Sequence, residues 1–183
     1  LSCGGQITHC DLLYLPTSNI NDGSSQRPAE AKSAYLALAG PSLPNRVAIY
    51  QLSFDFGSIQ PAQYPYIRST LCSLIDLPAR GIPRYDVTNV KFEKVLPLNN
   101  PLPRPLIITT SNGNQSFVSK WSPIPNDQKI YQITEEFHST VQNTSSYITM
   151  VNCFTNGQIL FGYFDGTLEL RSSQLGVIQT IYP

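Results

Sequence analysis

Alternation of apolar and polar side chains is the clearest pattern in this chain, and it begins near residue 46. In the segment Tyr50-Gln-Leu-Ser-Phe-Asp-Phe56 every second residue is apolar. Successive side chains of a strand point to opposite faces of a sheet, so this segment predicts a strand with one apolar face. That face carries Tyr50, Leu52, Phe54 and Phe56. We expect it to be covered, because apolar patches of this kind are rarely left in contact with water.

Similar short segments follow along the rest of the chain. They are rich in β-branched and aromatic residues and are bounded by Gly, Pro, Asn or Asp, as is typical of strands. They predict strands at residues 87–95, 106–110, 116–121, 129–137, 146–154, 158–164, 167–171 and 175–182. Many short strands separated by turns predict a mostly β fold, either an antiparallel sandwich or a barrel.

A hairpin is predicted at residues 159–171, where Asp165-Gly166 separates two apolar runs. A type I′ turn needs a positive φ at both of its central residues, and Asp and Gly adopt this conformation more readily than most residues, so Asp-Gly favours such a turn. Just upstream, Thr155-Asn-Gly157 joins the segment 146–154 to the same unit. Residues 146–183 are therefore expected to form a four-stranded C-terminal meander.

Helical spacing is much rarer in this sequence. In residues 66–77 the apolar side chains of Ile67, Leu71, Leu74 and Ile75 would lie on one side of a helix that ends at Pro78. Residues 27–38 fit a short helix, but from Tyr35 onward they fit a strand equally well. We therefore expect about one short helix packed on the sheets, and a loop-rich N-terminal part, residues 1–45, with one or two short strands.

The length of 183 residues suits a single β-rich domain with one core, spanning 1–183. No internal repeat and no linker with a shift in composition interrupts it. Pro-rich links at 40–44, 96–105 and 122–125 should be stiff, because proline fixes φ.

Composition limits the partners. Charged residues make up 13% of the chain, about half the usual share of a soluble domain. With 12 basic and 12 acidic residues and no basic run, the chain is not expected to bind nucleic acid. No apolar stretch reaches the ~20 residues that a membrane span needs, so no membrane span is expected.

The cysteines and sequons leave the compartment open. Four cysteines, Cys3, Cys10, Cys72 and Cys153, could form two disulfides in three ways or remain free thiols. The sequons at Asn114 and Asn143 would accept glycans in a secretory pathway. These features are compatible both with a secreted protein and with a reduced intracellular or virion protein.

Catalytic patterns are poorly supported. His138 and Ser139 are neighbours, as are Glu135 and Glu136, and a strand would place the members of each pair on opposite faces. The segment 3–10 holds three potential zinc ligands, but their spacing is not that of a known zinc site. We therefore expect no enzymatic activity, no catalytic residues, no metal and no cofactor.

Aromatic side chains beside polar loop residues offer the best candidates for a binding surface. An aromatic ring can stack on an apolar face of a ligand while Asn and Asp bind its hydroxyl or amide groups. The candidate ligand-binding residues are Trp121, Asn126, Asp127, Tyr64 and Tyr66. The competing interpretation is that Trp121 fills the core at a strand end and that the tyrosines only line a loop.

The C-terminal run from Ser146 to Leu170 resembles the late barrel strands of calicivirus-like coat protein protruding domains. The shared features are a strand, a glycine-containing turn, a Leu160-Phe161 pair in the next strand, and Gly166 before a further strand. The likeness covers about a seventh of the chain, so no attachment residue of that family is carried over to a position here.

The resemblance implies a virion surface domain, from a capsid or spike, that self-associates and attaches to a host glycan or protein receptor. A chain rich in Asn, Thr and Pro and poor in charge is compatible with such an exposed role. A second hypothesis is a secreted, extracellular β-sandwich of cellular origin that binds carbohydrate or protein. A third is a hydrolase whose site is assembled from distant residues.

Overall fold

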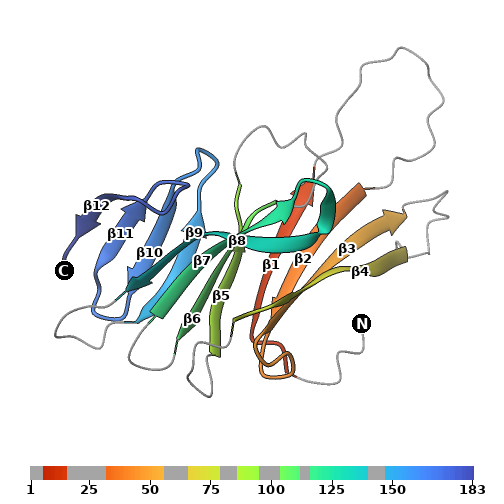
Figure 1. The fold of residues 1–183 in the computed structure, drawn as a ribbon, viewed down its shortest axis with the longest axis horizontal. Coiled ribbons are helices and arrows are strands. Elements are labelled where there is room, and N and C mark those ends of the chain that lie inside the picture. The colour runs from red at the N-terminus through yellow and green to blue at the C-terminus, as the bar shows by residue number, and fades with distance from the viewer. Residues whose placement is uncertain are drawn as a thin grey trace, which may run out of the picture.

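The chain folds into three antiparallel sheets of four strands each (Figure 1). The computed structural model describes residues 6–15, 32–55, 66–78, 86–94, 104–111, 116–139 and 147–183. The first sheet contains β1 (His9–Leu15), β2 (Lys32–Ala39), β3 (Arg46–Asp55) and β4 (Tyr66–Asp76). The middle sheet contains β5 (Asp86–Phe92), β6 (Leu106–Ser111), β7 (Ser116–Ile124) and β8 (Asp127–Ser139). The third sheet contains β9 (Ile148–Cys153), β10 (Ile159–Tyr163), β11 (Leu168–Arg171) and β12 (Val177–Ile181).

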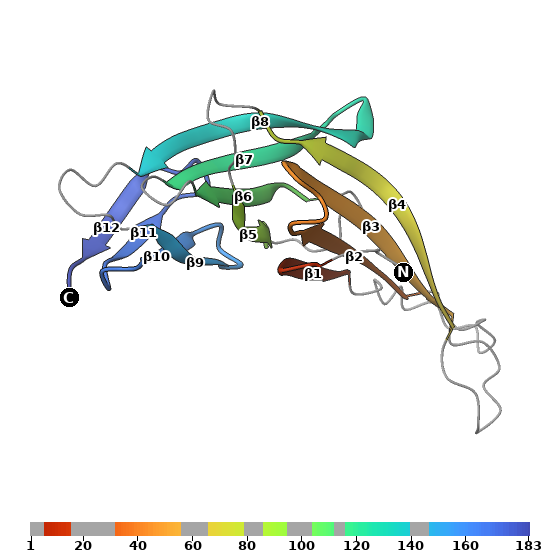
Figure 2. The same cartoon turned by 90° about the horizontal axis from the view of Figure 1, so that it is seen from below.

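Each sheet is a meander, so neighbouring strands in space are also consecutive in the sequence. The middle sheet lies between the other two, as both views show (Figures 1 and 2). Its strand β5 contacts both β1 and β9, and its other edge strand, β8, contacts β4. The predicted mostly β, sandwich-like architecture is thereby confirmed, as is the C-terminal four-stranded meander.

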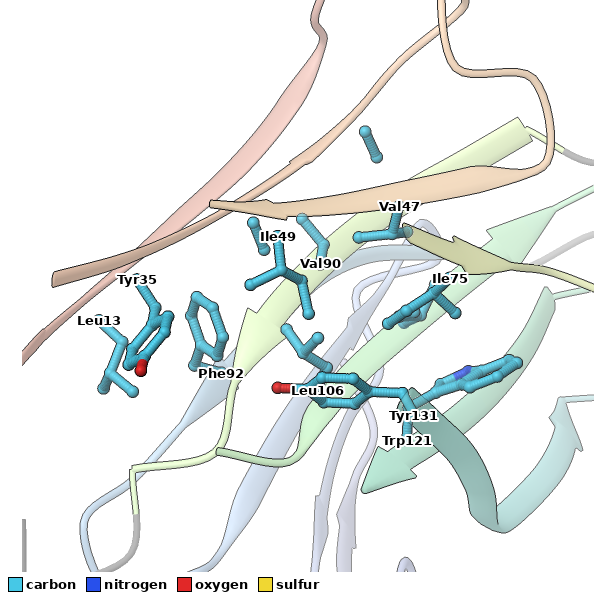
Figure 3. Packing of buried hydrophobic residues seen from close by; sticks show 13 residues of the cluster. Leu13, Tyr35, Val47, Ile49, Ile75, Val90, Phe92, Leu106, Trp121 and Tyr131 are labelled. Atoms are coloured by element: carbon cyan, nitrogen blue, oxygen red, sulfur yellow. The ribbon is translucent and has the colours of Figure 1, made fainter. Parts of the chain in front are cut away.

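The larger core lies between the first and middle sheets (Figure 3). Alternate side chains of β1, β2 and β3 point into it, where they meet side chains of β5 and β6. Its buried members are Leu13, Tyr35, Ala37, Ala39, Val47, Ile49, Ile75, Val90, Phe92, Leu106, Ile108, Trp121 and Tyr131. Such a core supplies most of the stability of the fold, because burial removes apolar surface from water.

A second core lies between the middle and third sheets. Phe161 and Ile159 of β10 pack with Ile107 and Val118 of the middle sheet. Strand β6 therefore serves two cores, since Leu106 and Ile108 belong to the first one and Ile107 to the second. This explains why its first three residues are all apolar and why Thr109 is buried as well, as is typical of a strand that is covered on both faces.

The expected helix at residues 66–77 is wrong. These residues form β4, which pairs with β3 along its whole length, and a register shift leaves Cys72 as an extra residue. A bulge of this kind moves the alternation of faces by one position. Ile67, Leu71 and Leu74 consequently share one face of the strand, although their spacing of four and then three residues also fits a helix. The described residues contain no helix, and none therefore could cross a membrane.

The segment 27–38 fitted either a helix or a strand in the sequence. From Lys32 onward it forms strand β2, and residues 27–31 lie outside the described residues. Among the residues predicted on the apolar face of β3, Tyr50, Leu52 and Phe54 do share a face. Phe56 and the asparagines of both sequons, Asn114 and Asn143, lie outside the described ranges.

The hairpin at Asp165-Gly166 is confirmed, but its predicted type I′ turn is wrong. Gly166 has φ 87°, whereas positive φ among the described non-glycine residues is confined to Asn45 and Leu175. The Tyr163 N–H donates to the Thr167 carbonyl at 2.9 Å, and the Asp165 carboxylate accepts the Thr167 N–H. The loop is therefore a three-residue turn that ends with glycine in the left-handed region.

The other two turns of the third sheet repeat this geometry. In one of them Gly157 has φ 85° and the Phe154 N–H donates to the Gln158 carbonyl at 2.9 Å. In the other, Leu175 occupies the left-handed position with φ 62°. Leucine rarely adopts this conformation, but the Leu175 side chain is buried in the second core, which stabilises the turn.

Three cysteines, Cys10, Cys72 and Cys153, have free thiols, and Cys3 lies outside the described residues. They differ in environment. Cys10 is exposed, whereas Cys153 is buried in the second core. Burial, together with the nearby carboxylates of Glu93 and Asp11, raises the pKa of the Cys153 thiol to about 12.

We expect Cys153 to be unreactive toward a thiol reagent at pH 8 until the protein unfolds, because almost none of it is thiolate and the side chain is buried. Cys10 should react in the folded monomer, where its thiol is exposed. Mass spectrometry of peptides after timed labelling measures both rates, with Cys10→Ser and Cys153→Ser variants for assignment. Equal rates for the two thiols in the folded protein would contradict the buried position of Cys153.

Candidate functional site

Trp121, the leading candidate from the sequence, belongs to the larger core. Only 6% of its surface is exposed, and its indole N–H donates to the Ser119 Oγ at 2.8 Å. Of the two roles that the sequence allowed, the structure shows the core one. Trp121 is therefore not available to stack on a ligand at the surface.

The remaining candidates are not brought into one site. Asn126 and Asp127 are exposed in the tight turn between β7 and β8. Tyr66 begins β4 and its side chain is not described, while Tyr64 lies outside the described residues. It is the far end of β4 that packs beside β8, where Ile75 meets Tyr131 (Figures 2 and 3). Nine residues of extended strand separate Tyr66 from Ile75, or roughly 30 Å.

A different location offers a pocket. A cavity of about 600 Å³ lies where the starts of β1 and β5 meet the turn between β2 and β3. Its lining residues are Thr8, His9, Gly40, Pro41, Leu43, Pro44, Asn45, Asp86, Val87 and Thr88. Cavities of this size are typical of small-molecule sites.

One wall is the turn from Gly40 to Asn45. A Cβ atom on Gly40 would lie 2.6 Å from the Gln6 carbonyl oxygen, so this close approach requires glycine. The Leu43 N–H donates to the Gly40 carbonyl at 2.9 Å. Asn45 follows with φ 55°, and its carbonyl accepts the Leu77 N–H at 2.8 Å. The turn is thus tied to β1 on one side and to the end of β4 on the other.

The opposite wall is the first part of β5. Val87 pairs with Thr110 and Asn89 pairs with Thr109, so Thr88 is the extra residue of a bulge. The Thr88 and Thr109 hydroxyl groups lie 2.7 Å apart and are hydrogen-bonded to each other. Bulges of this kind redirect side chains at sheet edges, where binding sites are common.

The ionisable groups of the pocket are His9 and Asp86. Partial burial lowers the pKa of His9 below its ordinary value of 6.5, because it disfavours the charged imidazolium. The lowered pKa favours the neutral imidazole. Thr8, Asn45 and Thr88 add neutral hydrogen-bonding groups, and Pro41, Leu43, Pro44 and Val87 add apolar surface.

No protein family model matches this chain, and no curated protein is significantly similar to it. The function of the pocket must therefore be inferred from its own chemistry. Within the part of the chain that the structure describes, no three His, Cys, Asp or Glu side chains are grouped as a metal site would require. The lining combines hydrogen-bonding and apolar groups, which suits a small, partly polar ligand.

This pocket is not predicted by the sequence. From the sequence, His9 is only a potential zinc ligand beside the cysteines, and residues 40–44 are only a stiff link. The missing information was the contact between β1 and β5, which brings Thr8 and Asp86 together from opposite ends of a long stretch of chain. The one local indication of the pocket in the sequence was Gly40, which is followed by Pro41 and Pro44 in the segment between two strands.

We expect His9 to titrate below pH 6.5 in the folded protein. The unfolded chain binds a proton near 6.5 and the folded chain only at lower pH, so His9 lowers the stability as the pH falls through 6.5. Two-dimensional NMR of the imidazole protons measures this pKa, with His9→Gln identifying its signals against those of His138. A folded-state pKa at or above 6.5 would contradict the desolvated position.

Proposed function

We propose that this chain is a non-enzymatic attachment domain that binds a neutral host glycan in the pocket between the β2–β3 turn and the start of β5. The observation that carries this proposal is the lining of the pocket. Asp86, Asn45 and Thr8 can bind sugar hydroxyl groups. The apolar faces of Pro41, Leu43 and Pro44 can cover the C–H face of a sugar ring.

The charges of the pocket favour a neutral sugar over an acidic one. The described residues that line the pocket include no Lys or Arg, and Asp86 supplies a carboxylate. A sulfated or sialylated glycan would bring a second negative charge close to Asp86, and like charges repel. A neutral hexose or deoxyhexose avoids this cost.

A virion surface is the location that we propose, on the basis of the C-terminal resemblance, the low charge and the stiff proline-rich turns. A secreted cellular β-sandwich is the second candidate, and the sequons at Asn114 and Asn143 favour it. The two candidates share the same pocket chemistry. They differ in source, since only the secreted protein would carry glycans at both sequons when it is isolated from its natural host.

The test begins with a glycan array that contains neutral and sialylated glycans, followed by calorimetry with the best neutral sugar. Asp86→Ala should weaken binding at least about tenfold, because it removes a charge-assisted hydrogen bond. Asn45→Gly should weaken it as well, and glycine keeps the left-handed backbone at that position. Circular dichroism establishes that each variant remains folded.

The matched control is Asp127→Ala, which removes an exposed carboxylate from the β7–β8 turn, the site favoured by the sequence alone. Its binding should equal that of the unaltered protein. Loss of binding in Asp127→Ala with normal binding in Asp86→Ala would move the site to that turn. An array without any neutral binder would overturn the glycan proposal.

A further inference from the structure

The first sheet has a second apolar face, which points away from the middle sheet. We call it the outer face. Its side chains form rows across the strands, as the register shows. The central row is Leu12, Leu36, Tyr50 and Leu71, and one neighbouring row contains Cys10, Leu38, Ala48 and Leu74. On the other side follow a row of Tyr14, Ala34, Leu52 and Ser69 and then a row of Lys32, Phe54 and Ile67.

Several large side chains of the outer face are open to water. Leu12 and Leu71 are each 52% exposed, Ile67 is 55% exposed and Leu74 is 43% exposed. The first sheet lies at one end of the molecule in both views, and no described strand packs on its outer side (Figures 1 and 2). A contiguous patch of this extent is unusual on a monomer and marks an interaction surface.

The strand sequences also indicate that this sheet is covered on both faces. Residues Ala34 to Ala39 of β2 form an uninterrupted apolar run, longer than the run of three apolar residues that begins β6. A sheet with one wet face shows alternation instead. Leu38 and Ala48 are already almost completely buried by their neighbours, yet neither belongs to one of the two cores.

Charge does not oppose self-association on this surface. Lys32, whose side chain is not described, begins β2 beside Phe54 at one end of the outer face. Among the described side chains that point outward from the first sheet, the charged ones are Arg46 and Asp76, at the other end. They form an ion pair of 2.6 Å with each other. The charged residues thus lie at the two ends of the outer face, and the apolar rows between them carry no charge.

We propose that the outer face is a homodimer interface, on which a second copy of this chain packs its own outer face about a two-fold axis. Isologous dimers of this kind are the commonest oligomers. Sheets pack face to face at a separation of about 10 Å with their side chains interdigitated. The interface is independent of the proposed glycan pocket, which is built on the turn beyond β2.

The size of the face fits this occupant. Four strands and four rows of outward side chains span about 19 Å by 26 Å, or roughly 500 Å² in plan. Two such faces bury about 1,000 Å², which is the lower limit for a specific interface. A reversible dimer is therefore expected.

Sedimentation equilibrium of the whole chain tests the proposal over protein concentrations from about 1 to 100 µM, a range suited to an interface of this size. The unaltered protein should approach twice the monomer mass as the concentration rises. Leu71→Glu should raise the dimer dissociation constant at least about a hundredfold, because each dimer would bury two unpaired charges. Leu12→Glu, in the same row, should have the same effect.

Ile178→Glu is the matched control, since Ile178 of β12 is 51% exposed and far from the outer face. It should dimerise like the unaltered protein. Circular dichroism of the monomeric variants should show an intact β fold. A protein that stays monomeric throughout the range would overturn the proposal. Dissociation by Ile178→Glu but not by the two leucine variants would overturn it too, and would assign the contact to the β12 edge.

Discussion

The structure depends on how the free backbone hydrogen-bonding groups at the edge of β5 are paired, because the three sheets meet at this strand. The Asp11 carboxylate of β1 accepts the backbone N–H of Phe92 at 2.8 Å and the Lys91 Nζ at 3.1 Å. An unpaired backbone donor at a buried edge would be costly. One side chain of the first sheet therefore pairs a backbone N–H at the edge of the middle sheet and holds β1 beside β5. The pocket forms where these two strands begin.

A second polar contact from the same segment reaches the third sheet. Glu93 and Lys120 form an ion pair of 3.0 Å, and both side chains are almost completely buried. The Lys120 Nζ also donates to the Ser173 carbonyl at 2.7 Å, in the turn between β11 and β12. The apolar cores supply most of the stability, whereas these directional contacts fix the positions of the sheets relative to one another.

The sequence predicted those strands and turns that are determined by residues close together in the chain. The C-terminal meander could be recognised because its turns carry their own glycines, and the strands from residue 86 onward because their patterns are regular. Strand β4 was mistaken for a helix because the bulge at Cys72 gives its apolar residues a helical spacing. The burial of Trp121 and the position of the pocket depend on how the sheets pack against each other. Neither the burial of an indole nor the proximity of Thr8 and Asp86 can be predicted from neighbouring residues in the sequence.

The turn of the last hairpin, which contains Leu175, depends on the second core, whereas the turns of the two neighbouring hairpins do not. The turns at Gly157 and Gly166 use glycine at the left-handed position and can close by themselves, but Leu175 holds φ 62° only while its side chain fills the second core. We therefore expect β12 to join its sheet late in folding, after β9, β10 and the middle sheet have made that core. Pulsed hydrogen exchange during refolding would then show the β12 amides protected last, and their early protection would contradict this order.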